Sequence, residues 1–490
     1  MLSSFMGFVS LYFMTRYLGA ENYGIFAWST AFVAVFTIFS DMGVGYAHLK
    51  RVSEGCSLGG CVSTFAFLKL LLTLLMVGVC LTYITLSYLV FGNEFPGRLL
   101  SVVLLLLTYM VLSSLSQIAR TTFDSKLETS KSQFVAMIDS LSKTALVILV
   151  LLAGMGVVQV ALAYAIAGVV VATVSLLLLS RERIMWQKPI LLRSYGAFAF
   201  PIAVASIAGT LLANSDRLVI GQFWSKTDVA YYASAQSLLL MFGAVGTVLS
   251  FISFPVFSKL HKEGRTSTIS EHIRQSERYI SMISLPLVTL FLLFPRAAAV
   301  VFFGKDFAPA GQALGFLSIS VFCYQLNQVA CAQVIASNKP YVLAKLTWFH
   351  LCLNVSLLIL FVPRNVFGIA AMGLSYQGAA IANMTAMVVL FVLTRWYINR
   401  TAKIGIYRRL YLHVLAALLV GVALALLTTF VDPDNWYELA SFGVFSYVSF
   451  LSILYLFGEF SKQDISQILD VLSIRKMKEY VWTEFSGKRM

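Results

Sequence analysis

Residues 61–91 read CVSTFAFLKLLLTLLMVGVCLTYITLSYLVF and contain one charged residue, Lys69. About 20 apolar residues are enough for a helix to cross the hydrocarbon core of a membrane, and this run is longer. Its apolar residues do not alternate strictly with polar ones, as they would in a strand of a membrane barrel. The stretch therefore predicts a transmembrane helix.

Similar runs recur along the whole chain of 490 residues, of which 59% are hydrophobic and 12% charged. The mean hydropathy is +0.84, and soluble domains contain about 25% charged residues, so the composition argues against a cytosolic enzyme. We predict an all-α polytopic membrane protein with about fourteen transmembrane helices. The predicted segments are 1–18, 23–40, 61–91, 99–119, 134–153, 157–180, 196–223, 229–254, 279–303, 310–335, 342–362, 374–398, 410–431 and 439–457.

The positive charges of the loops predict the orientation in the membrane. The chain has 36 lysines and arginines and a net charge of +14. Most of these cations fall in alternate loops and in the C-terminal tail, which predicts that those loops and both termini are cytoplasmic. Because the charge is spread over loops rather than gathered in a basic domain, it does not indicate nucleic acid binding. The cations expected on the other side are Arg98, Lys226, Arg296, Lys305 and Arg364.

No catalytic residue, cofactor or metal site is predicted. The chain lacks a Gly-rich phosphate loop ending in Lys-Ser or Lys-Thr, which argues against ATP hydrolysis. Cys80, Cys323, Cys331 and Cys352 fall inside apolar runs, and the neighbouring Cys56 and Cys61 have no His or Cys partners at zinc-ligand spacing. The cytoplasmic loops are too short for a soluble catalytic domain.

A weak internal repeat divides the chain. Residues 17–30 (YLGAENYGIFAWST) align with residues 223–236 (FWSKTDVAYYASAQ). Each copy begins at the end of a predicted helix, crosses a short polar turn and enters a helix rich in aromatic and small residues. An even number of helices separates the copies, which predicts two parallel lobes with a substrate site between them. We predict an N-terminal six-helix lobe at 1–193, a C-terminal six-helix lobe at 194–401, two extra helices at 402–457 and a cytoplasmic tail at 458–490.

Five short motifs occur in a familiar order. They are residues 16–24 (RYLGAENYG), 40–43 (SDMG), 215–221 (SDRLVIG), 303–309 (FGKDFAP) and 378–382 (GAAIA). Their combination resembles the polysaccharide flippases of the MATE-like superfamily of multidrug, oligosaccharidyl-lipid and polysaccharide exporters. The resemblance covers about residues 1–400.

The resemblance implies a flippase for O-antigen or capsule repeat units. Such a protein moves a polyprenyl-diphosphate-linked oligosaccharide from the cytoplasmic to the outer leaflet of the inner membrane, with a polysaccharide polymerase or assembly proteins as possible partners. The alternative is an ion-coupled multidrug or cation antiporter of the same fold, which Lys69 and Lys143 near the membrane midplane disfavour. A membrane glycosyltransferase is disfavoured because the loop at 432–438 is too small for a catalytic domain.

Charged residues within the apolar runs are candidates for the substrate site, because they are costly in lipid unless they face a cavity or a partner. Arg16, Lys69, Lys143 and Arg217 are the candidate diphosphate ligands, and Asp41, Asp139 and Asp216 are candidate ion-coupling residues or counter-charges. Asp139 precedes Lys143 by four residues, a spacing that favours an ion pair. Structural pairing or interfacial anchoring explains these cations as well. Asp41 is also expected to cap the segment that follows it.

Polar amides recur in the second half of the chain. Neutral donors and acceptors are suited to bind sugars, although hydrogen bonds between helices explain the amides equally well. We expect aromatic pairs such as Tyr231 and Tyr232 to be interfacial packing. The candidate sugar contacts are Gln236, Gln325, Asn327, Asn354 and Asn383.

Overall fold

The computed structural model describes residues 2–91, 96–182, 184–189, 191–366, 368–428 and 435–460. Within them the chain forms α-helices, the 3-10 turn η1 (Lys305–Phe307) and a short antiparallel hairpin of β1 (Asn365–Val366) and β2 (Ile369–Ala370). The helices are α1 (Leu2–Asp41), α2 (Val44–Ser53), α3 (Leu58–Phe91), α4 (Gly97–Ser125), α5 (Thr129–Leu152), α6 (Val157–Ser180), α7 (Leu192–Phe223), α8 (Lys226–Lys262), α9 (Thr266–Leu293), α10 (Pro295–Phe303), α11 (Ala310–Ala336), α12 (Pro340–Phe361), α13 (Ser375–Ala402), α14 (Leu410–Leu427) and α15 (Trp436–Leu456).

Thirteen helices of the described residues are long and apolar enough to cross a membrane. The predicted all-α polytopic class is confirmed. The first of these helices, Ser3–Asp41, contains both of the first two predicted segments. A straight helix of its 39 residues would be roughly 58 Å long, about twice the hydrocarbon thickness. Gly19 breaks it with φ 72° and ψ 172°, a conformation that suits glycine, so two predicted helices meet at this residue.

Two local features differ from the prediction. Asp41 does not cap the next helix: the N-cap of α2 is Gly43, which makes no side-chain cap, and the Asp41 carboxylate instead pairs with Lys69. The segment predicted at 279–303 is divided into α9 and α10, because Pro295 has no N–H to continue α9 and occupies the first turn of α10.

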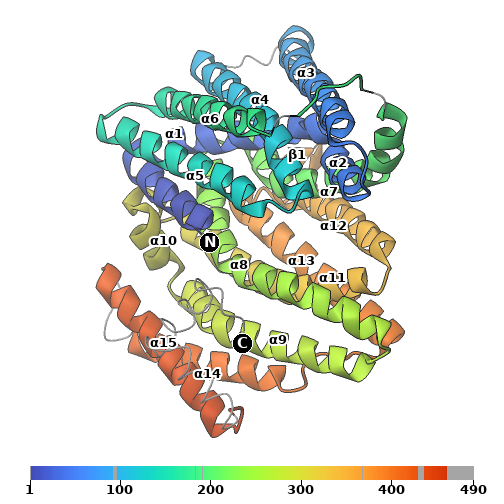
Figure 1. Ribbon diagram of the computed structural model, residues 1–490. Coiled ribbons are helices and arrows are strands. Elements are labelled where there is room, and N and C mark those ends of the chain that lie inside the picture. Colours follow the sequence, from blue (N-terminus) through green and yellow to red (C-terminus); the bar gives the residue numbers. More distant parts are fainter. Residues whose placement is uncertain are drawn as a thin grey trace, which may run out of the picture.

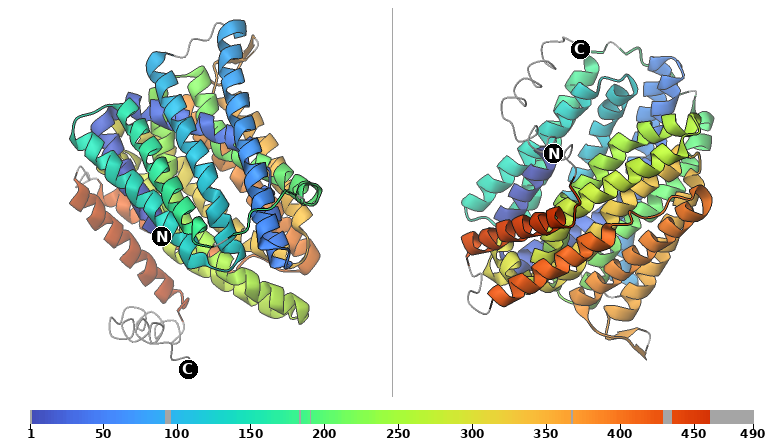
Figure 2. Two further views of the ribbon diagram at one scale, coloured as in Figure 1. Left: turned by 45° about the horizontal axis from the view of Figure 1, so that its top comes forward. Right: turned by 90° about the horizontal axis from the view of Figure 1, so that it is seen from below.

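The helices form two groups with a peripheral pair. In Figure 1, α1–α6 occupy the upper part and α8–α13 the lower part, while α14 and α15 lie beyond α9 at the lower left. The right-hand view of Figure 2 also places α14 and α15 along one side of the bundle, next to α9. We call α1–α6 the N-terminal group and α7–α13 the C-terminal group. The main contacts between the groups join α1 to α7, α8 and α10, and α2 to α7.

The largest apolar core contains residues of both groups and lies toward one end of the bundle. This cation-poor end carries the Gly19 break, the turn between α7 and α8, and η1. Its core, which we call the shared core, includes Tyr23, Phe26 and Trp28 of α1 together with Val229 and Phe307. At the opposite, cation-rich end the core divides in two.

The two clusters at the cation-rich end contain different helices. The first unites α2, α3, α4 and the start of α7 around Phe65, Phe123 and Tyr195. The second unites α8, α9, α11 and α13 around Phe257 and Ile280. Among the described residues, helices of both groups therefore share an apolar core at the cation-poor end. At the other end, the cluster of α8, α9, α11 and α13 is separate from the one that joins α2–α4 to the start of α7.

Candidate functional site

Asp216 of α7 is the centre of a buried polar cluster in the C-terminal group. It is only 1% exposed, and its carboxylate accepts hydrogen bonds from the Tyr232 hydroxyl of α8, the Asn354 amide of α12 at 3.1 Å and the Asn383 amide of α13 at 3.2 Å. Asn383 in turn accepts a bond from Ser320 of α11 at 2.7 Å. The described neighbours that bond to this buried carboxylate are therefore all neutral.

Arg217 follows Asp216 but has a different partner. Its Nε donates to Oε1 of Gln236 on α8 at 3.1 Å, and the arginine is partly exposed. Gln236 lies one helical turn after Tyr232, so one face of α8 holds both Asp216 and Arg217 of α7. The structure thus brings five of the candidate residues together: Asp216, Arg217, Gln236, Asn354 and Asn383.

Lys143 and Asp139 form the predicted ion pair in the N-terminal group. Nζ of Lys143 lies 2.8 Å from Oδ2 of Asp139 and donates to the Tyr109 hydroxyl at 2.9 Å. The ammonium also lies 5.8 Å from the ring centroid of Tyr164, at a distance where the π face attracts a cation. Both members of the pair are about one-fifth exposed, so the pair is reachable by a solvated group.

Lys69 and Asp41 form a second, separate pair. Nζ of Lys69 lies 3.1 Å from Oδ1 of Asp41; the lysine side chain is fully buried, whereas the aspartate side chain is 41% exposed. The lysine therefore does not extend to the membrane surface. Its charge is neutralised by a carboxylate at the exposed end of α1.

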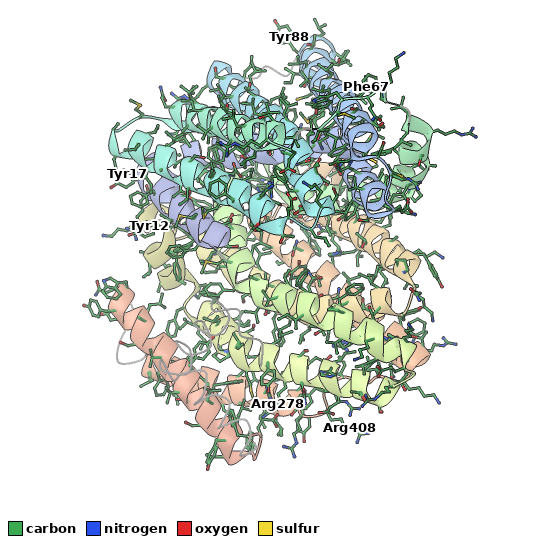
Figure 3. The ribbon with its side chains drawn as sticks, in the orientation of Figure 1. Tyr12, Tyr17, Phe67, Tyr88, Arg278 and Arg408 are labelled. Carbon is green, nitrogen blue, oxygen red and sulfur yellow. The ribbon has the colours of Figure 1, made fainter. Side chains whose placement is uncertain are left out.

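Arg16 lies at the boundary between the two groups. Its Nη2 donates to the backbone carbonyl of Val301 on α10 at 2.8 Å, and its guanidinium lies 4.5 Å from the ring centroid of Tyr12. Figure 3 shows Tyr12 and Tyr17 on this outer side of α1. Arg16 is exposed, and the structure places it beside α10 rather than in the Asp216 cluster.

The remaining candidate amides lie elsewhere in the C-terminal group. Gln325 of α11 accepts a bond from Ser284 at 2.9 Å and lines a small apolar cavity of about 30 Å³ between α8, α9 and α11. Asn327 donates to the sulfur of Cys331 at 3.5 Å. In this conformation the protein's own polar groups therefore bind all five candidate amides.

The sequence interpretation missed the aromatic partners of the charges. Tyr232, expected to be interfacial packing, is fully buried and donates to Asp216, so that expectation is wrong. Tyr109 and Tyr164 were not singled out. For Tyr232, the sequence did offer a signal: it lies four residues before Gln236, on the same face of α8. Within the described residues, no group of three or more His, Cys, Asp or Glu side chains is arranged to hold a metal ion.

Comparison with known proteins places this arrangement in a family. Residues 13–312 match the family model described as "Polysaccharide biosynthesis protein". The chain is 24% identical over 402 residues to the probable low-salt glycan biosynthesis flippase Agl15 of Haloferax volcanii, covering 81% of this chain and 80% of the relative. It is also 25% identical over 214 residues to the multidrug resistance protein MdtK of Pectobacterium atrosepticum, covering 43% and 46%.

Solved structures share the fold. The lipid II flippase MurJ in an inward closed conformation matches with a TM-score of 0.73 at 15% identity, covering 92% of this chain and 97% of MurJ. A multidrug resistance MATE family transporter matches with a TM-score of 0.65 at 16% identity, covering 82% and 96%. These relatives are flippases and transporters rather than enzymes. The chain belongs to the polysaccharide biosynthesis protein family, and it shares its fold with the MurJ flippase and with a MATE family transporter.

Proposed function

We propose that this protein flips a polyprenyl-diphosphate-linked oligosaccharide repeat unit, of the O-antigen or capsule type, from the cytoplasmic to the outer leaflet by alternating access. The observation that carries the proposal is the state of Arg217. Gln236 holds its Nε, and no described residue forms a hydrogen bond to its two terminal nitrogens. A positioned guanidinium with a free edge is suited to donate two parallel hydrogen bonds to a phosphate.

Lys143 supplies a second cation for the diphosphate. Asp139 and Tyr109 occupy two of the three ammonium protons, which leaves one for a ligand. In this proposal Arg16 guides the headgroup at the boundary between the groups, and Asp139 is a counter-charge. Lys69 and Asp41 are a positioning pair, because the lysine is fully buried.

Asp216 is the proposed ion-coupling residue. Its carboxylate is buried among neutral hydrogen-bond donors, and it forms no ion pair with a described cation, although Arg217 is its neighbour in the chain. A buried anion in that state favours taking up a proton or a metal cation. Gln236, Asn354 and Asn383 then become available to sugars only when the cluster rearranges, and Gln325 and Asn327 remain proposed sugar contacts.

We also propose the orientation of the protein, its membrane, its lobes and its partners. The cation-rich end faces the cytoplasm, the protein resides in the inner membrane, and both termini are cytoplasmic. The lobes are residues 1–193 and 194–401, followed by peripheral helices at 402–457. The tail at 458–490 lies largely outside the described residues. A polysaccharide polymerase or assembly proteins receive the flipped unit.

The test is translocation in proteoliposomes. A fluorescent polyprenyl-diphosphate oligosaccharide is supplied on one leaflet, and its appearance on the other is followed. Arg217→Gln should slow flipping by about 10-fold to 100-fold, since a hydrogen bond to a charged group contributes about 1.5–3 kcal/mol. Arg217→Lys should retain part of the rate, and Arg98→Gln, at an exposed cation outside the site, should be unaffected. A double variant Lys143→Gln, Arg217→Gln that flips at the normal rate would refute the site.

The second candidate function is ion-coupled export of organic cations. The buried, unneutralised carboxylate of Asp216 favours it, because an acidic pocket attracts cations. The same proteoliposomes, loaded with a cationic dye under a proton or sodium gradient, distinguish the two functions. Dye export without oligosaccharide flipping would replace the first proposal with the second.

A further inference from the structure

Two glycines that end two of the sequence motifs lie in one contact between the two groups. Gly24 ends RYLGAENYG on α1, and Gly221 ends SDRLVIG on α7. A Cβ added to Gly24 would lie 1.7 Å from the backbone oxygen of Lys226, at the start of α8. A Cβ added to Gly221 would lie 2.1 Å from Cδ1 of Trp28 on α1. Neither position has room for a side chain.

Lys226 and Trp28 join the two close contacts into one unit. Nζ of Lys226 lies 3.9 Å from the centroid of a Trp28 ring and donates to the backbone carbonyl of Gly221 at 3.0 Å. Gly24 and Trp28 are four residues apart on α1, so they lie on the same face of that helix. The unit therefore fastens one face of α1 to the turn between α7 and α8.

This contact lies within the shared core at the cation-poor end. Trp28, Tyr23 and Val229 belong to that core. At the cation-rich end, the cluster of α8, α9, α11 and α13 is separate from the cluster that joins α2–α4 to the start of α7. Apolar area in lipid gives little drive for helices to associate, so close backbone approach at glycines is an effective means of closing the seam. Alternating access requires the seam to open.

We propose that Gly24, Trp28, Gly221 and Lys226 form a lock that closes the cation-poor side of the transport path, and that the structure shows the protein with this lock closed. The inference rests on the proposed function for its role in transport. A side chain at either glycine is a wedge that holds the groups apart at this end. The two motif glycines are positioning residues for one conformational state and do not contact substrate.

The experiment measures access rather than transport. All six native cysteines are replaced, and Ser234→Cys is introduced as a reporter. Ser234 is fully buried and lies one helical turn after Ala230, whose Cβ is 3.4 Å from the Cβ position of Gly24. A membrane-impermeant maleimide is applied from the cation-poor side of intact cells, and the labelling rate is compared among variants at equal membrane content.

The wedges are Gly24→Ala and Gly221→Ala. Each should raise the reporter's labelling rate tenfold or more, because a shift of about 1.4 kcal/mol between the closed and open states is sufficient for a tenfold change in population. The matched controls are Gly7→Ala on α1 and Gly209→Ala on α7, where an added Cβ meets nothing within 4 Å. These controls should leave the reporter protected.

A protected reporter in both correctly inserted wedge variants would overturn the lock. If the wedge variants fail to insert, Trp28→Ala is the deciding variant, because it removes the indole that packs on Gly221 and adds no clash. Faster labelling of the reporter in this variant supports the lock. Unchanged protection of the reporter overturns it. Failure of the proposed function has a different signature. In that case the proteoliposomes flip no oligosaccharide, while the labelling pattern of wedges and controls is still obtained.

Discussion

The Asn354 side-chain amide donates to Oδ1 of Asp216 across 3.1 Å, although the two residues are 138 positions apart in the chain. Asn354 projects from α12 and Asp216 from α7. Together with the hydrogen bonds from Tyr232 and Asn383, this bond connects α7 through the Asp216 carboxylate to α8, α12 and α13. Any event that changes the charge of Asp216 therefore acts on the packing of α7 against α8, α12 and α13.

Removal of the Asp216 carboxylate should destabilise the fold more than its neutralisation. Asp216→Ala leaves three buried donors without an acceptor, at about 1–3 kcal/mol each, so we expect a loss of about 3 kcal/mol or more in the free energy of unfolding. Asp216→Asn keeps an acceptor oxygen and should lose less, while abolishing any dependence of flipping on an ion gradient. Thermal unfolding in detergent and gradient-driven flipping measure the two effects. An Asp216→Ala variant as stable as the unchanged protein would contradict the arrangement.

The Lys69–Asp41 pair should respond asymmetrically to substitution. Asp41→Asn leaves the fully buried Lys69 ammonium without a counter-charge and should cost about 3–5 kcal/mol of stability. Lys69→Met leaves a carboxylate that is 41% exposed and remains hydrated, so it should cost less. Comparison of the unfolding temperatures of the two variants checks this order. Equal losses would show that burial does not determine the effect.

His48 should make the protein sensitive to mild acid. It lies on α2 between the Tyr195 hydroxyl at 3.0 Å and the Thr122 hydroxyl at 3.1 Å. Burial lowers the pKa of His48 from 6.5 to about 4, despite a smaller opposing effect from the backbone of Cys61. The unfolded chain therefore binds the proton first. The neutral His48 ring makes its full contribution to the free energy of unfolding above pH 6.5. This contribution decreases as the pH falls from 6.5 toward 4, by about 3 kcal/mol in total.

The measurement for His48 is the unfolding free energy between pH 7.5 and 4. His48→Gln should flatten the slope between pH 6.5 and 4, and His272→Gln, at an exposed position on α9, should leave it unchanged. An unaltered slope in the His48 variant would assign the acid sensitivity to other groups.

Glu459 should matter at a lower pH. It follows α15, and its carboxylate lies 3.0 Å from Nε of Arg278 on α9 and 3.4 Å from both Nη1 of Arg409 and Nε2 of His413. Figure 3 shows Arg278 in this lower region of the molecule. Burial alone would raise the pKa of Glu459, but the Tyr407 hydroxyl and the neighbouring positive charges outweigh it, and the pKa lies below its usual 4.5.

A carboxyl with a lowered pKa stabilises the fold above its unfolded pKa and loses that contribution as the pH falls through the folded value. We therefore expect Glu459→Gln to destabilise the attachment of α14 and α15 to α9 at neutral pH, and this effect should diminish as the pH falls through the lowered pKa of the folded state. Hydrogen exchange of α14 and α15 at pH 7 and pH 4 measures this. Glu271→Gln, at an exposed position on α9, is the control.

The helical class could be predicted because each helix is a local property. A long apolar run must satisfy its own backbone hydrogen bonds in lipid, and only a helix does so within one segment. The Asp139–Lys143 pair was predictable for the same reason, since a spacing of four residues defines a helix face. The break at Gly19 also falls between two predicted segments.

Partners on different helices could not be predicted. The sequence indicated that Arg217 and Asp216 are in a membrane helix, but not that Gln236 would hold the arginine and three neutral donors the aspartate. Lys69 illustrates the same limit: its depth follows from the length of α3, whereas its pairing with Asp41 depends on how α1 and α3 rotate against each other.

From the chain alone one learns the class of the protein, the approximate positions of its apolar segments and the residues too polar for lipid. The folded molecule adds which of those residues meet, and that Gly24 and Gly221 close a single seam. The difference is physical, because hydrophobicity and spacing act along one helix, whereas the rotation and approach of neighbouring helices are set by packing between segments far apart in sequence.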